Sequence, residues 1–339
     1  ISDRVLGDDF SLVNLRSRCL VIFYKESNLF KLNTSNLIRT DKSRRSTSWR
    51  HKKSKIASYA FLLCALVSIL TTIGIVTSLL IQAWPFFNVV SIIDFIFGTR
   101  WSPILKPRDY GVLPLVCGTL LVALISAVIA IPSGVGIAIF LSEYVPNKIR
   151  SILKPFIEIL AGIPTVVYGY FALTFLTPQL QKILPDLIIF NALSAGLVMG
   201  LMIIPFVASL SEDAMIAVPR SLREGAYALG ATKGEVAFKV VVPAALSGVI
   251  ASFLLALSRA IGETMLVTIA AGATPRLTFN PMESIQTMTA FIVQLSLGET
   301  PHGSLEFNTI FAVGLMLFAL TISMNIIGSF VVSKWGVRY

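Results

Sequence analysis

Charged residues are scarce in this chain of 339 residues. Asp, Glu, Lys and Arg make up 14% of it and hydrophobic residues 55%, whereas soluble domains average about 25% charged residues. A soluble protein needs charge to cover its surface, so this scarcity excludes an ordinary globular protein of this size. The mean hydropathy of +0.80 indicates that lipid is one of the solvents of the chain.

Histidine and cysteine are also rare, and their spacing fits no common site. His51 and His302 lie far apart in the sequence, which argues against a metal site built on histidine. Cys19, Cys64 and Cys117 fit neither a disulfide framework nor a zinc site. No Walker A, GxSxG or HExxH motif occurs. We therefore expect no metal, no cofactor and no enzymatic activity in this chain.

Six apolar stretches are long enough to form membrane-spanning helices. About 20 helical residues cross a hydrocarbon core of about 30 Å, because each residue adds about 1.5 Å. The first stretch is too long for a secretory signal peptide, and Pro132 predicts a kink in the second. The sequence therefore predicts an all-α integral membrane protein with spans at Ile56–Ile81, Val112–Leu141, Phe156–Leu176, Leu187–Leu210, Ala244–Ala271 and Thr309–Ser333.

The basic residues predict the side of the membrane on which each loop lies. With a cytoplasmic N-terminus, sixteen Lys and Arg residues fall in inside segments and five in outside segments. Cytoplasmic loops carry the basic excess, so the net charge of +10 is attributed to topology rather than to nucleic-acid binding. We expect a multi-pass cell-membrane protein with both termini cytoplasmic. Its expected parts are a partly disordered cytosolic tail with a basic end (1–55), a first span (56–82), an external loop (83–111), a five-span core (112–335) with a cytoplasmic loop (211–243), and a cytosolic C-terminus (336–339).

The predicted cytoplasmic loop contains a short helix–turn–helix pattern. Glu224, Gly225 and Ala226 are followed by Gly230 and later by Pro243. Glycine and proline mark helix ends, and Gly230 can adopt the left-handed conformation there. An ordinary amphipathic loop is the alternative. The pattern resembles the EAA loop of binding-protein-dependent ABC permeases. That resemblance implies a type I ABC importer permease fold, in which these five residues couple the spans to a groove on a separate ATPase subunit.

A wider resemblance covers the chain from about residue 111 to the C-terminus. The matching segments are IFLSEY (139–144), EILAGIP (158–164), SLSEDAM (209–215), PRSLRE (219–224), SRAIGET (258–264) and QTMTAF (286–291). They are similar to PstC-type phosphate permeases, which implies a subunit of an ATP-driven phosphate importer. The implied partners are a PstA-like second permease that completes the translocation pathway, a dimer of PstB-like ATPase subunits and a PstS-like extracytoplasmic phosphate-binding protein.

Arg259 is the only one of the 28 basic residues that lies inside a predicted span. A charge at the bilayer centre costs about 2.5–3.5 kcal/mol on insertion scales, so it needs a partner or a water-lined cavity. Glu263 follows four residues later, which on one helix face would bring the two side chains within pairing distance. The resemblance implies that both residues act in passage of the anion. The alternative is an ion pair that only packs helices.

Glu158 and the external loop Thr274–Asn308 each allow two interpretations. Glu158 lies near the cytoplasmic start of the third predicted span, where it either lines the pathway or reaches the membrane interface. The loop either docks the solute-binding protein or partly re-enters the membrane. The sequence does not decide either question.

Three other functions account for parts of the sequence. An importer of another oxyanion, such as sulfate or molybdate, would meet the same physical requirements. An intramembrane enzyme would need a nucleophile–base pair or paired aspartates, but the predicted spans contain no histidine and no aspartate, Asp213 lying just past one end. A passive scaffold would have no need of a loop that couples to an ATPase. The sequence therefore favours a permease subunit of a phosphate importer.

Overall fold

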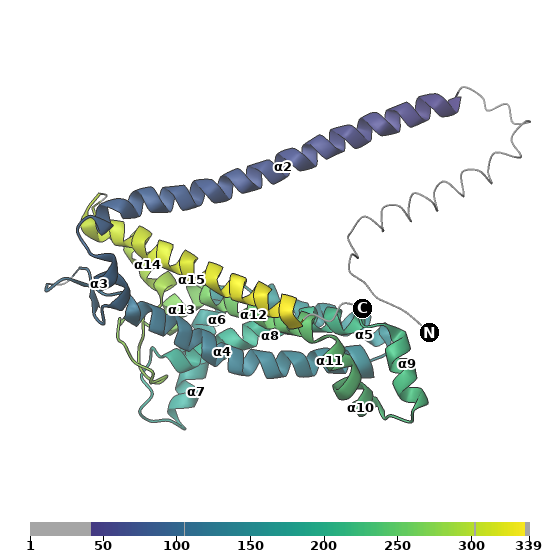
Figure 1. The fold of residues 1–339 in the computed structure, drawn as a ribbon. Helices are drawn as coiled ribbons and strands as arrows, with labels where there is room; N and C mark the ends of the chain where they lie inside the picture. The colour runs from purple at the N-terminus through teal and green to yellow at the C-terminus, as the bar shows by residue number, and fades with distance from the viewer. Residues whose placement is uncertain (1–41, 105, 302, 336–339) are drawn as a thin grey trace, which may run out of the picture. The chain divides into compact units, whose positions relative to one another are not determined.

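The computed structural model describes residues 42–104, 106–301 and 303–335, and most of these residues are helical (Figure 1). The chain divides into two compact units, residues 1–71 and 72–339. Helix α2 (Lys42–Phe87) begins in the first unit and ends in the second. Of the predicted cytosolic tail, only 42–55 fall among the described residues, where they are helical. The predicted C-terminal segment 336–339 lies outside the described residues.

Four helices in the described part of the chain are long and apolar enough to cross a membrane. They are Ala57–Phe87 within α2, Leu113–Tyr144, Ala192–Ile216 and Leu305–Lys334. Two further pairs of helices meet the same criterion together but are bent. The bends are 76° between Asn147–Ala161 and Thr165–Gln181, and 70° between Lys233–Ala244 and Leu246–Ile261. Counting each bent pair as one span gives six, the number predicted from the sequence.

The elements of the second unit are mostly helices, with one pair of very short strands. Trp101 lies opposite Tyr110 in this antiparallel pair of two-residue strands. The mostly helical architecture confirms the predicted all-α fold. In chain order the elements after α2 are α3 (Ile92–Phe97), β1 (Trp101–Ser102), β2 (Asp109–Tyr110), α4 (Leu113–Ile139), η1 (Phe140–Tyr144), α5 (Asn147–Ala161), α6 (Thr165–Phe171), η2 (Ala172–Leu176), α7 (Thr177–Gln181), α8 (Ala192–Ile216), α9 (Arg220–Ala228), α10 (Lys233–Val236), η3 (Ala237–Val241), α11 (Val242–Ala244), α12 (Leu246–Ile261), α13 (Met265–Ala270), α14 (Met288–Leu297) and α15 (Leu305–Trp335), where η denotes a π-helical turn.

The third predicted span is two helices rather than one. Helix α5 ends before Gly162, and α6 begins directly after Pro164. Proline lacks a backbone N–H and disfavours the helical conformation in the residue before it. The chain therefore turns between these two helices. In contrast, α4 continues through Pro132 as one unbroken helix.

Small residues allow α4 and α8 to pack closely at the centre of the second unit. A Cβ atom at Gly196 of α8 would lie 2.6 Å from the side chain of Ile125, and one at Gly134 of α4 would lie 2.7 Å from that of Val207. Neither position has room for a larger side chain. Close backbone approach at small residues is the usual basis of helix association in lipid, where neighbouring tails are as apolar as the side chains.

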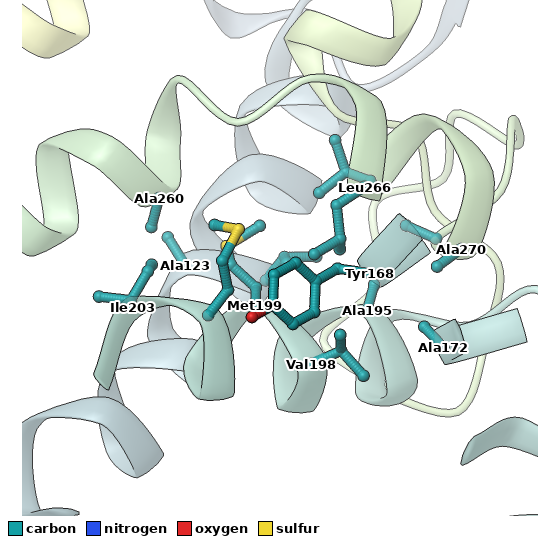
Figure 2. Packing of buried hydrophobic residues seen from close by; sticks show 14 of the residues in the cluster. Ala123, Tyr168, Ala172, Ala195, Val198, Met199, Ile203, Ala260, Leu266 and Ala270 are labelled. Carbon is teal, nitrogen blue, oxygen red and sulfur yellow. The ribbon is translucent and has the colours of Figure 1, made fainter. Parts of the chain in front are cut away.

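The largest buried cluster is formed by side chains of α4, α6, α8, α12 and α13 (Figure 2). Met199 of α8 and Leu266 of α13 are fully buried, and Tyr168 of α6 lies beside them. The hydroxyl group of Tyr168 donates to the carbonyl oxygen of Leu160 at 2.7 Å, which satisfies its polar end and ties α6 to α5. This cluster holds α12, and with it Arg259, in a defined position against α8.

The loop Thr274–Asn308 contains α14, whose ten residues are too few to span a bilayer. The backbone N–H of Met288 donates to Oγ1 of Thr119 in α4 at 3.0 Å. The ring of Phe291 meets that of Trp101 edge-on, with 5.0 Å between the centroids. The loop is therefore folded against the N-terminal half of α4 and the β1 strand.

Candidate functional site

Arg259 lies in the last turn of α12 with its side chain exposed. Its guanidinium carbon is 6.0 Å from the centroid of the Phe206 ring on α8, at the outer limit of a cation–π contact. Within the described residues, no carboxylate forms an ion pair with it. The positive charge of Arg259 is therefore available to a ligand.

Glu263 does not share a helical face with Arg259, contrary to the expectation from their spacing. Helix α12 ends at Ile261, and Gly262 follows as its C-cap. The Oε1 atom of Glu263 accepts from the backbone N–H of Leu266 at 3.4 Å, at the start of α13. Glycine after a helix is a sequence signal for its end, so the break could have been foreseen from the Gly262–Glu263 pair.

A side chain of α14 stabilises the break between α12 and α13. The hydroxyl group of Thr289 donates to the backbone carbonyl oxygen of Glu263 at 2.7 Å. Thr289 is 5% exposed, so this is a buried contact between segments far apart in the sequence. The segments SRAIGET and QTMTAF, which carry part of the family resemblance, thus meet at this point.

Glu158 of α5 and Arg259 of α12 contact the same side of α8. The Oε1 atom of Glu158 accepts from the hydroxyl group of Ser209 at 3.0 Å. Ser209 and Phe206 are three residues apart on α8, so their side chains are neighbours on the helix surface. The structure therefore places a carboxylate and a guanidinium about one helical turn apart along α8.

The loop predicted to be cytoplasmic forms two short helical segments joined at Gly230. Helix α9 precedes this glycine, whose φ of +82° is the left-handed value expected from the sequence. Thr232 then starts α10 with a capping box, in which its hydroxyl oxygen accepts from the Glu235 N–H and the Glu235 carboxylate accepts from the Thr232 N–H. Because α8 extends to Ile216, the loop begins later than residue 211.

The residues expected to couple to an ATPase differ in their exposure. Glu224 and Gly225 on α9, Gly230 at the turn and Pro243 in α11 are exposed, whereas Ala226 is partly buried. Helix α9 contains no buried residue. Figure 1 shows α9 and α10 together at one end of the second unit. This end presents a surface that another protein could contact.

The second half of the loop is anchored by apolar side chains. Val236, Ala237 and Val241 are fully buried in one cluster with Ile139 of α4 and Met215 of α8. This cluster, which we call the loop cluster, also includes Ala138, Val218, Ala245 and Val249. It fixes α10 and η3 to the ends of the two central helices.

Two buried carboxylates near this loop were not singled out from the sequence. Glu212 of α8 is fully buried, and its oxygens lie 2.7 Å from Nε of Arg150 and 2.9 Å from Nζ of Lys154 on α5. These contacts are ion pairs without good hydrogen-bond geometry. Glu143 of η1 pairs with Arg223 of α9 at 3.1 Å. Glu143, Glu212 and Arg223 all lie in segments that carry the family resemblance.

Basic residues gather around one open cavity of about 790 Å³ lined by residues from 99–102, 106–109 and 275–283. Arg100, Lys106 and Arg276 line it, together with the acidic Asp109 and Glu283. All three basic residues belong to segments predicted to be external. Within the part of the chain that the structure describes, no cluster of His, Cys, Asp and Glu could hold a metal ion.

Comparison with known proteins gives matches over most of the chain. Residues 134–336 match the family described as "Binding-protein-dependent transport system inner membrane component". The probable ABC transporter permease protein YqgH of Bacillus subtilis is 39% identical over 260 residues, 76% of this chain and 84% of the relative. The phosphate transport system permease protein PstC of Haemophilus influenzae is 34% identical over 291 residues, 80% of this chain and 90% of the relative.

Solved structures with a similar fold also come from ABC transporters. A chain of a bacterial transporter that imports the acidic polysaccharide alginate superposes with a TM-score of 0.59 at 14% identity, covering 86% of this chain and all of that one. A chain of the MetNI methionine transporter in an inward-facing conformation gives a TM-score of 0.51 at 19% identity, covering 66% and 96%. At these identities the similarity is one of fold.

Proposed function

Since the chain belongs to the family of binding-protein-dependent transport system inner membrane components, we propose that it is the permease subunit of an ATP-driven phosphate importer. Membership makes it a multi-pass permease subunit of an ABC importer, and its fold is that of a type I importer permease. Phosphate as the substrate and ATP hydrolysis by a separate subunit are the proposed parts. Similarity to PstC proteins over about four-fifths of the chain is the observation that carries the choice of phosphate.

Arg259 supplies the positive charge that an anion needs within a low-dielectric region. Phosphate carries one to two negative charges near neutral pH, and a planar guanidinium suits two-point contact with its oxygens. Arg259 is exposed and lies among predicted spans without an ion-pair partner in the described residues. It is therefore proposed to bind the anion during its passage.

Glu263 and Glu158 are proposed to keep that binding weak. Conduction requires an ion to leave its site again, and carboxylates near Arg259 lower the positive potential that holds the anion. Glu263 stands four residues beyond Arg259, past the helix end. Glu158 stands about one turn further along α8, on the side towards the proposed cytoplasmic loop. Phosphate would pass Arg259 before it reaches Glu158.

The proposed partners follow from the exposed loop and from the topology. Glu224, Gly225, Ala226, Gly230 and Pro243 are proposed to contact a dimer of ATPase subunits on the cytoplasmic side, where both termini are also placed. A second permease would complete the translocation pathway. An extracytoplasmic phosphate-binding protein would deliver the anion on the side of the Arg100, Lys106 and Arg276 cavity, whose basic residues attract anions.

Uptake of radiolabelled phosphate into proteoliposomes tests this function. The chain would be co-expressed and reconstituted with its partner subunits, and uptake measured with ATP, without ATP and with excess sulfate or molybdate. We expect ATP-dependent phosphate uptake that neither competitor reduces. Uptake of sulfate or molybdate in place of phosphate would assign the permease to another oxyanion.

A further inference from the structure

The guanidinium group of Arg223 on α9 contacts three separate parts of the chain. Its Nε and Nη2 atoms donate to Oε1 of Glu143 in η1 at 3.2 and 3.1 Å. Its Nη1 atom donates to the carbonyl oxygen of Val218 at 2.7 Å, and Nη2 also donates to that of Met215 at 2.7 Å. Met215 belongs to the last turn of α8, and η1 continues α4. One side chain thus joins α9 to the ends of both central helices.

This contact is largely shielded from solvent. The side chains of Arg223 and Glu143 are 16% and 5% exposed. The last carbonyl groups of a helix have no partners within the helix, and Arg223 supplies donors for Met215 in α8 and for Val218 just beyond it. The planar guanidinium has donors in fixed directions, so these bonds define the orientation of α9 as well as its position.

Few other contacts hold α9 in place. The helix has no buried residue, and of its apolar side chains only the partly buried Ala226 packs against the loop cluster. A cavity of about 300 Å³ lies beside the Arg223–Glu143 contact, lined also by Glu224 and Tyr227 of α9. On that side α9 is therefore attached by polar bonds rather than by packed apolar side chains.

We infer that Arg223, held by Glu143, is a positioning residue that makes the ends of α4 and α8 follow the movement of α9. This inference rests on the proposed contact between α9 and an ATPase subunit. Charge-assisted hydrogen bonds are strong and directional, and here they hold α9 on the side where it has no packed apolar contacts. Arg223 therefore carries movement of α9 directly to the ends of α4 and α8, in addition to the loop cluster that holds α10 and η3 there.

The ratio of phosphate imported to ATP hydrolysed tests this role. In the reconstituted complex, Arg223→Gln should lower the ratio roughly 10-fold to 100-fold, within the usual range of coupling between two sites of a protein, with the ATPase subunit still co-purifying. Arg223→Lys should recover part of the loss. Lys239→Gln removes the exposed Lys239–Glu235 ion pair of the same loop and should leave the ratio unchanged. An unchanged ratio in Arg223→Gln, or loss of the ATPase subunit from that variant, would overturn the inference.

A covalent link in place of the ion pair separates transmission from folding. Arg223→Cys and Glu143→Cys would be combined in a chain whose three native cysteines are replaced by alanine. This variant should be uncoupled, a short bifunctional thiol reagent should restore the ratio, and a reductant should reverse the effect. Efficient cross-linking without restored coupling would refute the inference. A wild-type complex that imports another oxyanion would overturn only the phosphate assignment, and the ratio would then be measured with that ion.

Discussion

Arg259 of α12 lies over the ring of Phe206 on α8, with 6.0 Å between the guanidinium carbon and the ring centroid. This distance is at the outer limit of a cation–π contact, and the ring does not neutralise the guanidinium, because an aromatic ring carries no net charge. Among the described residues no carboxylate pairs with Arg259, so its hydrogen-bond donors are available to an anion. The sequence predicted Glu263 on the same helical face as Arg259, whereas the structure places Phe206 of α8 beside Arg259 and Glu263 past the end of the helix.

Arg259→Gln should reduce phosphate uptake at least tenfold, which corresponds to a rise of about 1.4 kcal/mol in the barrier. Arg259→Lys should restore uptake only in part, because an ammonium group keeps the charge but not the planar fork. Initial uptake rates in proteoliposomes, normalised to assembled complex, measure both effects. Lys182→Gln makes the same change of charge at an exposed residue outside the predicted spans and should leave uptake unchanged.

Exchanging the two charges tests whether Arg259 and Glu263 form only a structural pair. A packing ion pair works in either order, so Arg259→Glu combined with Glu263→Arg would then restore transport. The structure predicts failure, because Glu263 lies past the end of α12, so the two positions do not share a helical face and are not interchangeable. Full recovery of uptake in the double variant would rule out the proposed anion site.

The helix–helix contact between α4 and α8 predicts opposite outcomes at two glycines of α4. A Cβ atom at Gly134 would lie 2.7 Å from Val207, whereas one at Gly136 would meet nothing within 4 Å. Gly134→Ala should therefore destabilise the protein by about 1–3 kcal/mol, the usual cost of overpacking. Gly136→Ala should be neutral or slightly stabilising, since alanine favours helix. Thermal unfolding of the two purified variants in detergent gives the comparison, and equal transition temperatures would contradict the packing.

Sequence reasoning found the features of this fold that depend on local chemistry. The length of the apolar stretches located the spans. The need for a turn between two short helical segments identified Gly230, whose φ is positive as expected. The prediction for Glu263 was wrong. Its spacing of four residues from Arg259 indicates a shared helical face, but Gly262 ends the helix before Glu263 is reached. Contacts between distant segments, such as Arg223 with Glu143, have no signature in periodicity, because they depend on how the helices pack.

Gly230→Val should uncouple transport from ATP hydrolysis while the protein remains in the membrane. A left-handed conformation costs a residue with a Cβ atom roughly 1–2 kcal/mol, and a β-branched side chain is stiffer still. A Cβ atom at Gly230 would meet nothing within 4 Å, so the strain comes from the backbone alone. Gly230→Asn should be milder, because asparagine tolerates this conformation. Phosphate uptake per ATP hydrolysed is the measurement, and wild-type coupling in the valine variant would contradict the role of the turn.

The proposed topology predicts that Lys233 and Asn280 lie on opposite sides of the membrane. Single cysteines at these positions, in a chain without its native cysteines, should react differently with an impermeant thiol reagent in intact cells. The cysteine at 280 should be labelled directly, and the one at 233 only after the membrane is permeabilised. Labelling of both in intact cells would exclude the orientation that the basic residues predict.

Glu212 and Asp213 are adjacent on α8 but differ sharply in their surroundings. Glu212 is fully buried between Arg150 and Lys154, whereas the side chain of Asp213 is 60% exposed and forms an ion pair with Lys154. Glu212→Gln leaves Arg150 and Lys154 beside a neutral side chain. Breaking a buried ion pair costs about 3–5 kcal/mol, which is an upper bound here because the two cations are 28% and 24% exposed and Lys154 keeps its pair with Asp213. Asp213→Asn removes the same charge at the surface, where an ion pair contributes about 0–1 kcal/mol.

We therefore expect Glu212→Gln to lower the transition temperature in detergent strongly and Asp213→Asn to leave it nearly unchanged. Equal, small shifts in both variants would mean that Arg150 and Lys154 remain hydrated beside Glu212, and would contradict the buried cluster that joins α5 to α8.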